Sequence, residues 1–253
     1  MLVTCDTLPG DESWATRPDF RHRAGVAIFR LPVAENRSFA PQVTTLLTVD
    51  ERLRAQRYHR AQDHDRFMLG RAALRLVLGA YLGQPPAGLH FEPGPNKKPW
   101  LREAPNLHYN VTHAGNWILL AVAPAEVGID VERLDPAFTF QEVLDHSCSP
   151  AERSFINHSP VPYRAFYQLW TRKEALVKAT AQGIDAEFSQ VPALDGRYSV
   201  AGAGAEPEWL VSSFGVAADY VAAVAYPTAL GGSLRFYEVG PELLSSLHEA
   251  AAR

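Results

Sequence analysis

The sequence predicts an α+β fold in which helices accompany a mainly antiparallel sheet. Two pairs of strand-like runs support this prediction, because only a few residues separate the two runs of each pair, as in a hairpin. The pairs are Trp117 to Ala123 with Val127 to Val131, and Tyr220 to Tyr226 with Ser233 to Val239. This spacing favours antiparallel pairing over a doubly wound fold. A helix is predicted for the tail after Pro241, and a loop for Ala193 to Trp209.

Composition allows one large core or two modest ones, since 47% of the 253 residues are hydrophobic. We place a division near Pro124. Residues 1–123 contain 15 Lys and Arg against 11 Asp and Glu, whereas residues 124–253 contain 9 against 17. The sequence therefore predicts a basic N-terminal half and an acidic C-terminal half.

Nothing in the sequence indicates export or a membrane. Met1 to Trp14 is polar and acidic without the apolar core of a signal peptide, and no run reaches the ~20 apolar residues that span a bilayer. Two distant cysteines, Cys5 and Cys148, argue against a disulfide framework and against a zinc cluster. The expected location is the cytoplasm.

One helical region is predicted to begin near Thr48, where Thr48 and Glu51 form a capping-box pattern. Its arginines are Arg52, Arg54, Arg57, Arg60, Arg66, Arg71 and Arg75. A run of charges on a helix is usually a solvated face. From the pattern alone, these arginines are interpreted as surface residues.

A strand is predicted from Val127 to Val131, because apolar residues alternate there with Gly128, Asp130 and Glu132. Side chains two residues apart lie on one face of a strand, roughly 7 Å apart at the backbone. The two carboxylates could therefore converge on one hard cation. The alternative is an ordinary solvated strand face that leads into a turn.

A second helix is predicted from Tyr163 to Ala181, with Gly183 as its stop signal. Its expected buried side consists of Phe166, Leu169, Leu176 and Val177. Trp170, Glu174 and Lys178 recur at intervals of four and form one row beside this stripe. Read alone, the row is also compatible with a surface Glu–Lys pair next to a core tryptophan.

These segments resemble the signature motifs of the Sfp-type 4'-phosphopantetheinyl transferases. The string GIDVE resembles the family's (V/I)G(I/V)D motif with its following carboxylate, and WTRKEALVK resembles (F/W)xxKE with its second lysine. Asn96 to Pro99 resembles the GKP segment, and Tyr109 to Gly115 resembles FN(I/V)SH(S/A)G. Arg54 to Leu76 resembles the family's basic helical stretch, so the similarity runs from about residue 50 to 180.

The resemblance implies a fold and a reaction. The family has two similar α+β halves related by pseudo-twofold symmetry, with coenzyme A bound between them. Its members transfer the 4'-phosphopantetheine arm of coenzyme A to a serine of an apo acyl or peptidyl carrier protein, and adenosine 3',5'-bisphosphate leaves. By similarity, Asp130, Glu132 and Glu174 would hold Mg²⁺, or Mn²⁺, and Lys178 would contact the phosphate.

The identity of the base that accepts the serine proton stays open between Glu174 and Glu152. Glu152 matches a carboxylate that the family keeps ahead of its second motif. Its alternative is structural, because Ser149 as N-cap, Pro150 at the first position and Glu152 in the first turn fit a helix start.

Five further residues match positions that bind coenzyme A in the family, namely Arg54, Arg66, Lys98, Thr112 and His113. Lys98 and His113 have plain alternatives as turn residues. One departure matters, since some relatives have a cation shortly before the GKP segment, where this chain has Glu92 to Pro95. For that reason, the resemblance does not imply this contact to the 3'-phosphate here.

The expected partners are coenzyme A and a carrier protein, without nucleic acid, and the expected state is a monomer. A basic half for phosphates and an acidic half for a metal would place the site where the halves meet. Two other functions remain: a hydrolase that admits water to the pyrophosphate, and a non-catalytic module that binds coenzyme A or carriers. The sequence contains no Nudix-like box or GxGxxG pattern that would favour a hydrolase. A non-catalytic module would be expected to lack one of the three carboxylates, and all three are present.

Overall fold

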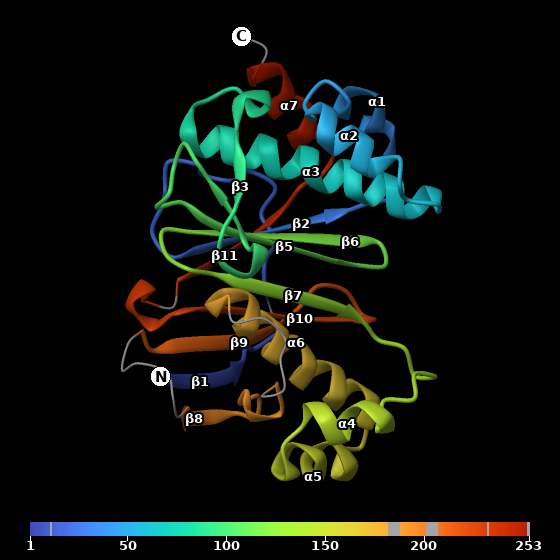
Figure 1. The fold of residues 1–253 in the computed structure, drawn as a ribbon, viewed down its shortest axis with the longest axis vertical. Coiled ribbons are helices and arrows are strands. Elements are labelled where there is room, and N and C mark those ends of the chain that lie inside the picture. The colour runs from blue at the N-terminus through green and yellow to red at the C-terminus, as the bar shows by residue number, and fades with distance from the viewer. Residues whose placement is uncertain (11, 182–187, 201–206, 232, 252–253) are drawn as a thin grey trace.

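Two sheets stack in the middle of the molecule, with helices on the outer side of each (Figure 1). The computed structural model describes residues 1–10, 12–181, 188–200, 207–231 and 233–251. One hydrophobic core fills the space between the first sheet and its helices, a second lies between the two sheets, and a third lies between the second sheet and helix α6. The central strands are therefore buried on both faces.

The first sheet has the order β11-β2-β6-β5 and is covered by α1, α2, α3 and α7. Its strands are β2 (Val26–Pro32), β5 (His108–Ala114), β6 (Trp117–Ala123) and β11 (Leu234–Glu238). Its helices are α1 (Ala40–Val43), α2 (Val49–Ala55), α3 (Ala61–Leu82) and α7 (Pro241–Ala251). A small separate ribbon pairs β3 (Phe91–Pro93) with β4 (Pro99–Leu101).

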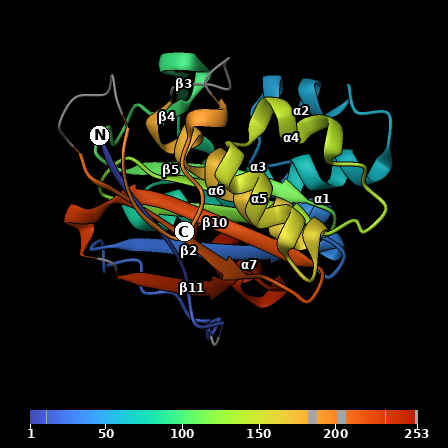
Figure 2. The same ribbon diagram turned by 90° about the horizontal axis from the view of Figure 1, so that it is seen from below.

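The second sheet has the order β7-β10-β9-β1-β8, and α6 runs across it (Figure 2). Its strands are β1 (Leu2–Thr7), β7 (Gly128–Arg133), β8 (Gly196–Ser199), β9 (Trp209–Gly215) and β10 (Tyr220–Pro227). Its helices are α4 (Gln141–Ser147), α5 (Pro150–His158) and α6 (Pro162–Thr180). None of the helices described is both long and apolar enough to cross a membrane.

The predicted α+β class with mainly antiparallel pairing is confirmed; the parallel pairs among the named strands are β11 with β2 and β1 with β9. Both sheets repeat one order: a strand, a long helix, then a hairpin whose second strand pairs with the first strand. These units are β2-α3-β5-β6 and β7-α6-β9-β10. Pseudo-twofold symmetry would produce such a repeat, and it stays a prediction.

Both of the hairpins predicted from spacing are wrong. β6 pairs with β2 and β5, whereas β7 pairs with β10, so the short link at residues 124–127 crosses from one sheet to the other. β10 and β11 likewise lie in different sheets. A short connection normally indicates a hairpin, but here β6 already pairs with β2 and β5, and β10 already pairs with β7 and β9. Local spacing carries no information about the distant partners β2 and β7.

The two ends of the chain cross the division that we placed near Pro124. β1 joins the sheet built mainly by the C-terminal half, and β11 with α7 joins the sheet built mainly by the N-terminal half. The predicted basic and acidic halves therefore correspond to the two sheets only for the central part of the chain, and not for its two ends.

Several local predictions are also settled. The capping box at Thr48 is confirmed, with Thr48 Oγ1 accepting from the Glu51 amide, but the expected single helix is two helices, because Arg60 is extended. The predicted loop from Ala193 to Trp209 contains β8 and reaches the start of β9, whereas the terminal helix is confirmed as α7. Gly183, the expected stop of α6, lies outside the described residues.

Lys97 and Ala181 have left-handed backbones, with φ of 64° and 53°. A left-handed residue with a Cβ costs about 1–2 kcal/mol, and glycine avoids this cost but loses part of the gain through its flexible unfolded state. We expect Lys97→Gly to stabilise the fold by about 0.5–1 kcal/mol, seen as a melting temperature higher by about 1–4 °C. Lys97→Ala is the matched control, and an equal gain from alanine would contradict the explanation.

Candidate active site

The candidate site lies where the two sheets meet, between the edge strands β5 and β7. Two side chains of β5 bridge this seam. The Ile129 amide donates to Asn110 Oδ1 at 2.9 Å, and Thr112 Oγ1 donates to Asp130 Oδ1 at 3.0 Å. The FN(I/V)SH-like and GIDVE segments are thus joined by hydrogen bonds.

Gly128 allows helix α6 to lie against β7. A Cβ atom on Gly128 would lie 2.0 Å from the Ala175 carbonyl oxygen and 2.4 Å from the Ala179 amide nitrogen. Any larger residue would therefore push the helix away from the strand. This close packing places Glu174 and Lys178 beside Asp130, which fits the expectation that the two motifs act together.

Asp130, Glu132 and Glu174 form what we call the carboxylate cluster. Lys178 Nζ lies 2.5 Å from Asp130 Oδ1 and 3.9 Å from Glu174 Oε2. Asp130 is buried, and its second oxygen, Oδ2, has no hydrogen-bond partner. An unpaired carboxylate oxygen in a buried position is costly unless something else binds it.

The electrostatics of the cluster indicate a shortage of positive charge. Burial, followed by the charges of Asp130 and Glu174, raises the pKa of Glu132 to about 7. Burial also raises the pKa values of Asp130 and Glu174, although Lys178 opposes both shifts. One ammonium group therefore does not balance three carboxylates, and an additional cation would stabilise their charged forms.

The residues present fit a hard divalent cation. The donors are carboxylate oxygens, which Mg²⁺ and Mn²⁺ prefer, and Asp130 Oδ2 is available as a ligand atom. Across the described part of the chain, no three His, Cys, Asp or Glu side chains already form a complete ligand set. The side chains of the carboxylate cluster would therefore have to move in order to coordinate the ion. Lys178, which contacts Asp130 and lies close to Glu174, would have to make room for it.

The raised pKa values predict how stability depends on pH without metal. Because the folded state holds the Glu132 proton more tightly than the unfolded chain does, this contribution is full below the ordinary pKa of 4.5 and is lost as pH rises through about 7. We expect Glu132→Gln to melt above the wild type near pH 8, and close to it near pH 5. Thermal melts in the presence of EDTA measure this effect. An equal difference in melting temperature between variant and wild type at pH 8 and at pH 5 would contradict it.

A pocket of about 240 Å³ lies beside the seam, and we call it the arginine pocket. Its lining contains three arginines, one histidine and no acidic residue. It is lined by Arg54, Tyr58, Arg66, Phe67, Gly70, Arg71, Leu74, Pro99, Tyr109, Asn110, Val111, His113 and Ile118. Cations and aromatic rings without carboxylates suit an anionic ligand that carries a heterocycle.

Arg54, Arg66 and His113, three of the residues expected to bind coenzyme A, meet in this pocket from α2, α3 and β5. Arg66 donates to the Gly115 carbonyl oxygen at 3.2 Å and to Asp63 Oδ1 at 2.5 Å, which fixes its guanidinium. Arg54 lies over the Phe67 ring at 5.2 Å. Partial burial of the His113 ring, followed by the charge of Arg66, lowers the pKa of His113, so its imidazole is neutral near pH 7.

The other two expected ligands of coenzyme A lie outside this lining. Thr112 bonds to Asp130, within the seam. Lys98 Nζ donates to Glu126 Oε2 at 2.5 Å and to the Ala179 carbonyl oxygen at 2.9 Å, so it is attached to the end of α6. Lys98 would have to exchange these partners to reach a phosphate.

The structure does not bring Glu152 to the carboxylate cluster. Its carboxylate accepts from the Ser149 amide in a capping box, and it pairs with Lys173 Nζ at 2.9 Å. Both side chains are almost fully buried, and Lys173 also donates to the Phe188 and Val191 carbonyl oxygens. The helix-start interpretation of Glu152 is confirmed, because the side chain caps α5 and ties α5 to α6.

Sequence reasoning missed Arg71, Tyr58 and Asn110. Arg71 was interpreted as a surface residue, but it lines the arginine pocket while bonding to Glu51. Its spacing of five residues from Arg66 gave no signal, because residues that share a helix face are usually three or four apart. Asn110 could have been found, since it lies within the FN(I/V)SH-like segment.

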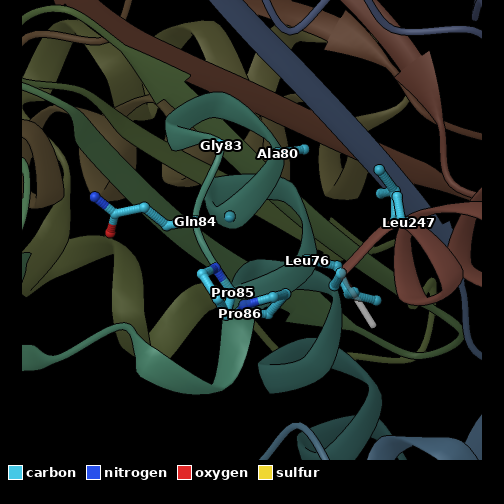
Figure 3. A pocket seen from close by; sticks show the side chains of 10 residues that line it. Leu76, Ala80, Gly83, Gln84, Pro85, Pro86 and Leu247 are labelled. Atoms are coloured by element: carbon cyan, nitrogen blue, oxygen red, sulfur yellow. The ribbon is translucent and has the colours of Figure 1, made fainter. Parts of the chain in front are cut away.

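Another pocket, of about 310 Å³, lies between the end of α3 and helix α7 (Figure 3). In Figure 3, Leu247 of α7 lies across the pocket from Pro85 and Pro86. No charged residue lines it, unlike the arginine pocket. It therefore does not suit a phosphate-bearing ligand.

Comparison with known proteins agrees with this geometry. Residues 35–125 match the family model "4'-phosphopantetheinyl transferase, N-terminal", and residues 126–225 match "4'-phosphopantetheinyl transferase superfamily". The putative 4'-phosphopantetheinyl transferase slr0495 of Synechocystis is 36% identical over 161 residues, which are 62% of this chain and 65% of the relative.

Two further relatives are similar to the chain over comparable lengths. The 4'-phosphopantetheinyl transferase psf-1 of Bacillus pumilus is 31% identical over 60% of this chain and 65% of its own length. The 4'-phosphopantetheinyl transferase HetI of Nostoc is 32% identical over 63% of this chain and 70% of its own length. The chain thus spans about two thirds of each relative, and it belongs to the 4'-phosphopantetheinyl transferase superfamily.

Proposed function

We propose that this protein transfers the 4'-phosphopantetheine arm of coenzyme A to a serine of an apo acyl or peptidyl carrier protein. One observation carries the proposal: neighbouring residues of β5 reach both features, since Thr112 bonds to Asp130 of the carboxylate cluster and His113 lines the arginine pocket. Coenzyme A has a pyrophosphate next to a phosphorylated nucleoside, so a metal site beside a cationic pocket suits it. The relatives' names support the same activity.

The arginine pocket would bind the nucleotide end. Arg54 and Arg66 supply fixed positive charge for its phosphates, and the neutral imidazole of His113 offers one N–H donor. Tyr58, Phe67 and Tyr109 supply aromatic walls against which a purine can pack. Lys98 would join these cations after leaving Glu126.

The seam would hold the reacting pyrophosphate. Asp130, Glu132 and Glu174 would hold Mg²⁺, which when bound neutralises phosphate charge and supports the leaving phosphate. Lys178 would donate to the same phosphate as a point charge. Thr112 orients Asp130 by donating to its Oδ1, which leaves Oδ2 free to act as a ligand.

Glu174 is the better supported of the two expected bases. Its pKa is raised by burial, which makes it a stronger proton acceptor than an ordinary carboxylate, and it belongs to the cluster. Glu152 is occupied by Lys173 and the Ser149 amide. We therefore propose Glu174 for the serine proton and a structural role for Glu152.

The proposal is tested by the intact mass of apo carrier proteins after incubation with this chain, coenzyme A and Mg²⁺. Fatty-acid, polyketide and peptide-synthetase carriers are tested in parallel, each with a serine-to-alanine control. A gain of one phosphopantetheine mass on the serine alone supports the transferase. Release of phosphopantetheine without any carrier would instead support a hydrolase, and binding without either product would support a binding module.

The arginine pocket carries a prediction of its own. Arg54→Ala and Arg66→Ala should each raise the KM for coenzyme A by about tenfold or more, because each removes a charge-assisted contact worth about 1.5–3 kcal/mol. The kcat should change less. Arg57→Ala is the matched control, since Arg57 is exposed and does not line the pocket. An equal effect of all three substitutions would contradict this assignment.

A further inference from the structure

The loop Gly94–Lys98 is attached to the end of helix α6 by two side chains. Asn96 Nδ2 donates to the Ala181 carbonyl oxygen, and Lys98 Nζ donates to the Ala179 carbonyl oxygen at 2.9 Å. The last carbonyl groups of a helix have no donor within the helix. Here two donors from one distant loop satisfy one carbonyl of the final turn, that of Ala179, and the carbonyl of the C-cap residue Ala181.

Backbone strain is concentrated at this same contact. Among the described residues, the non-glycine residues with positive φ are Asn96, Lys97 and Ala181, and all three belong to it. Such conformations cost free energy and persist only where surrounding contacts enforce them. The loop is also tight, because a Cβ on Gly94 would lie 2.7 Å from the Lys98 carbonyl oxygen.

A charged network holds Lys98 in its place. Glu126, just before β7, accepts from Lys98 Nζ and lies 3.2 Å from His108 Nδ1. The hydrogen bond from His108, together with that from Lys98, lowers the pKa of Glu126 to about 2, so the carboxylate stays charged. In the free protein the loop is thereby fixed to the approach of β7 and to the end of α6 together, and when Lys98 turns to a phosphate the Asn96 carboxamide is the anchor that stays.

The position of α6 matters because it carries Glu174 and Lys178. Gly128 lets the helix approach β7 sideways, and the buried hydrogen bonds of Arg172 and Lys173 fix its middle, so the last turn is the part that a further anchor can position. Lys178 must keep its 2.5 Å contact with Asp130, and it lies three residues before Ala181. A shift of the last turn would therefore move Lys178 directly, and Glu174, one turn earlier, to a smaller extent.

We propose that Asn96 is a positioning residue, whose carboxamide fixes the end of α6 and thereby places Glu174 and Lys178 against Asp130. The catalytic consequence rests on the proposed function, while the structural consequence does not. Asn96 is exposed, so its replacement should leave the core and the fold intact.

The test compares Asn96→Ala, Asn96→Gly and Lys97→Gly. Both Asn96 variants remove the carboxamide, but glycine also accommodates the φ of 48°, so the pair separates side chain from backbone. Lys97→Gly is the matched control in the same loop. Readouts are kcat and KM for coenzyme A, and hydrogen exchange of the amides in residues 177–181.

Both Asn96 variants should lower kcat by about tenfold, change the KM for coenzyme A less than about twofold, and speed exchange in the last turn by about tenfold. Lys97→Gly should change neither kcat nor KM, and it should not speed exchange, because it keeps the carboxamide. Wild-type kcat or unchanged exchange in Asn96→Gly would overturn the proposal, as would a change in KM alone. If the wild type transfers nothing, the proposed function fails. The exchange data then decide by themselves whether Asn96 fixes the end of α6.

Discussion

Replacing Glu174 with glutamine is expected to abolish transfer while the protein stays folded. The substitution takes a charged ligand from the carboxylate cluster and removes the proposed proton acceptor, so turnover should fall by about a thousandfold or more. Melting should not decrease, because burial already raises the pKa of Glu174 and a neutral amide relieves repulsion with Asp130. Intact-mass assays and thermal melts measure the two effects.

Glu152→Gln provides the contrast for this prediction. Glu152 pairs with the buried Lys173, so the amide should destabilise the fold by about 3 kcal/mol, because an ammonium is left without its partner. Turnover per folded molecule should change little.

One outcome would overturn the metal assignment: turnover at the wild-type rate by Glu174→Gln in excess EDTA.

Lys178→Ala is expected to lower the rate of the chemical step by about a hundredfold or more, with a smaller change in the KM for coenzyme A. Lys178 is the ammonium that contacts Asp130 and lies close to Glu174, and it is the proposed donor to the phosphate. Single-turnover rates at saturating coenzyme A measure this effect.

Lys178→Arg is the control, since it keeps the charge and should retain part of the rate. Without metal, Lys178→Ala should also lose stability near pH 8 more than near pH 5, because Glu132, whose pKa is raised to about 7, is protonated at the lower pH and the cluster then carries less negative charge. A lower melting temperature with unchanged turnover would show that the Glu174–Lys178 row is purely structural.

Local patterns in the sequence predict the elements of the site well. The alternation around Asp130 predicts strand β7, and the row of Trp170, Glu174 and Lys178 predicts helix α6. Both signals arise from residues a few positions apart, where strand and helix periods are short-range properties. The resemblance to a known family adds what periodicity cannot, namely that these two elements meet.

Long-range pairing could not be predicted in this way. The link between β6 and β7 looks like a hairpin connection, yet it crosses between sheets, because β2 and β5 already pair with β6. The same limit applies to side-chain partners. No short-range pattern indicates that Lys98 contacts the Ala179 carbonyl, or that Lys173 neutralises Glu152 inside the protein.

The most direct test of the account is a crystal structure of the complex with coenzyme A and Mn²⁺, in which anomalous scattering locates the ion. We predict one ion bound by Asp130, Glu132 and Glu174, with the pyrophosphate opposite them and the nucleotide in the arginine pocket. An ion bound elsewhere, or Glu174 outside coordinating distance while the nucleotide is bound, would contradict the mechanism.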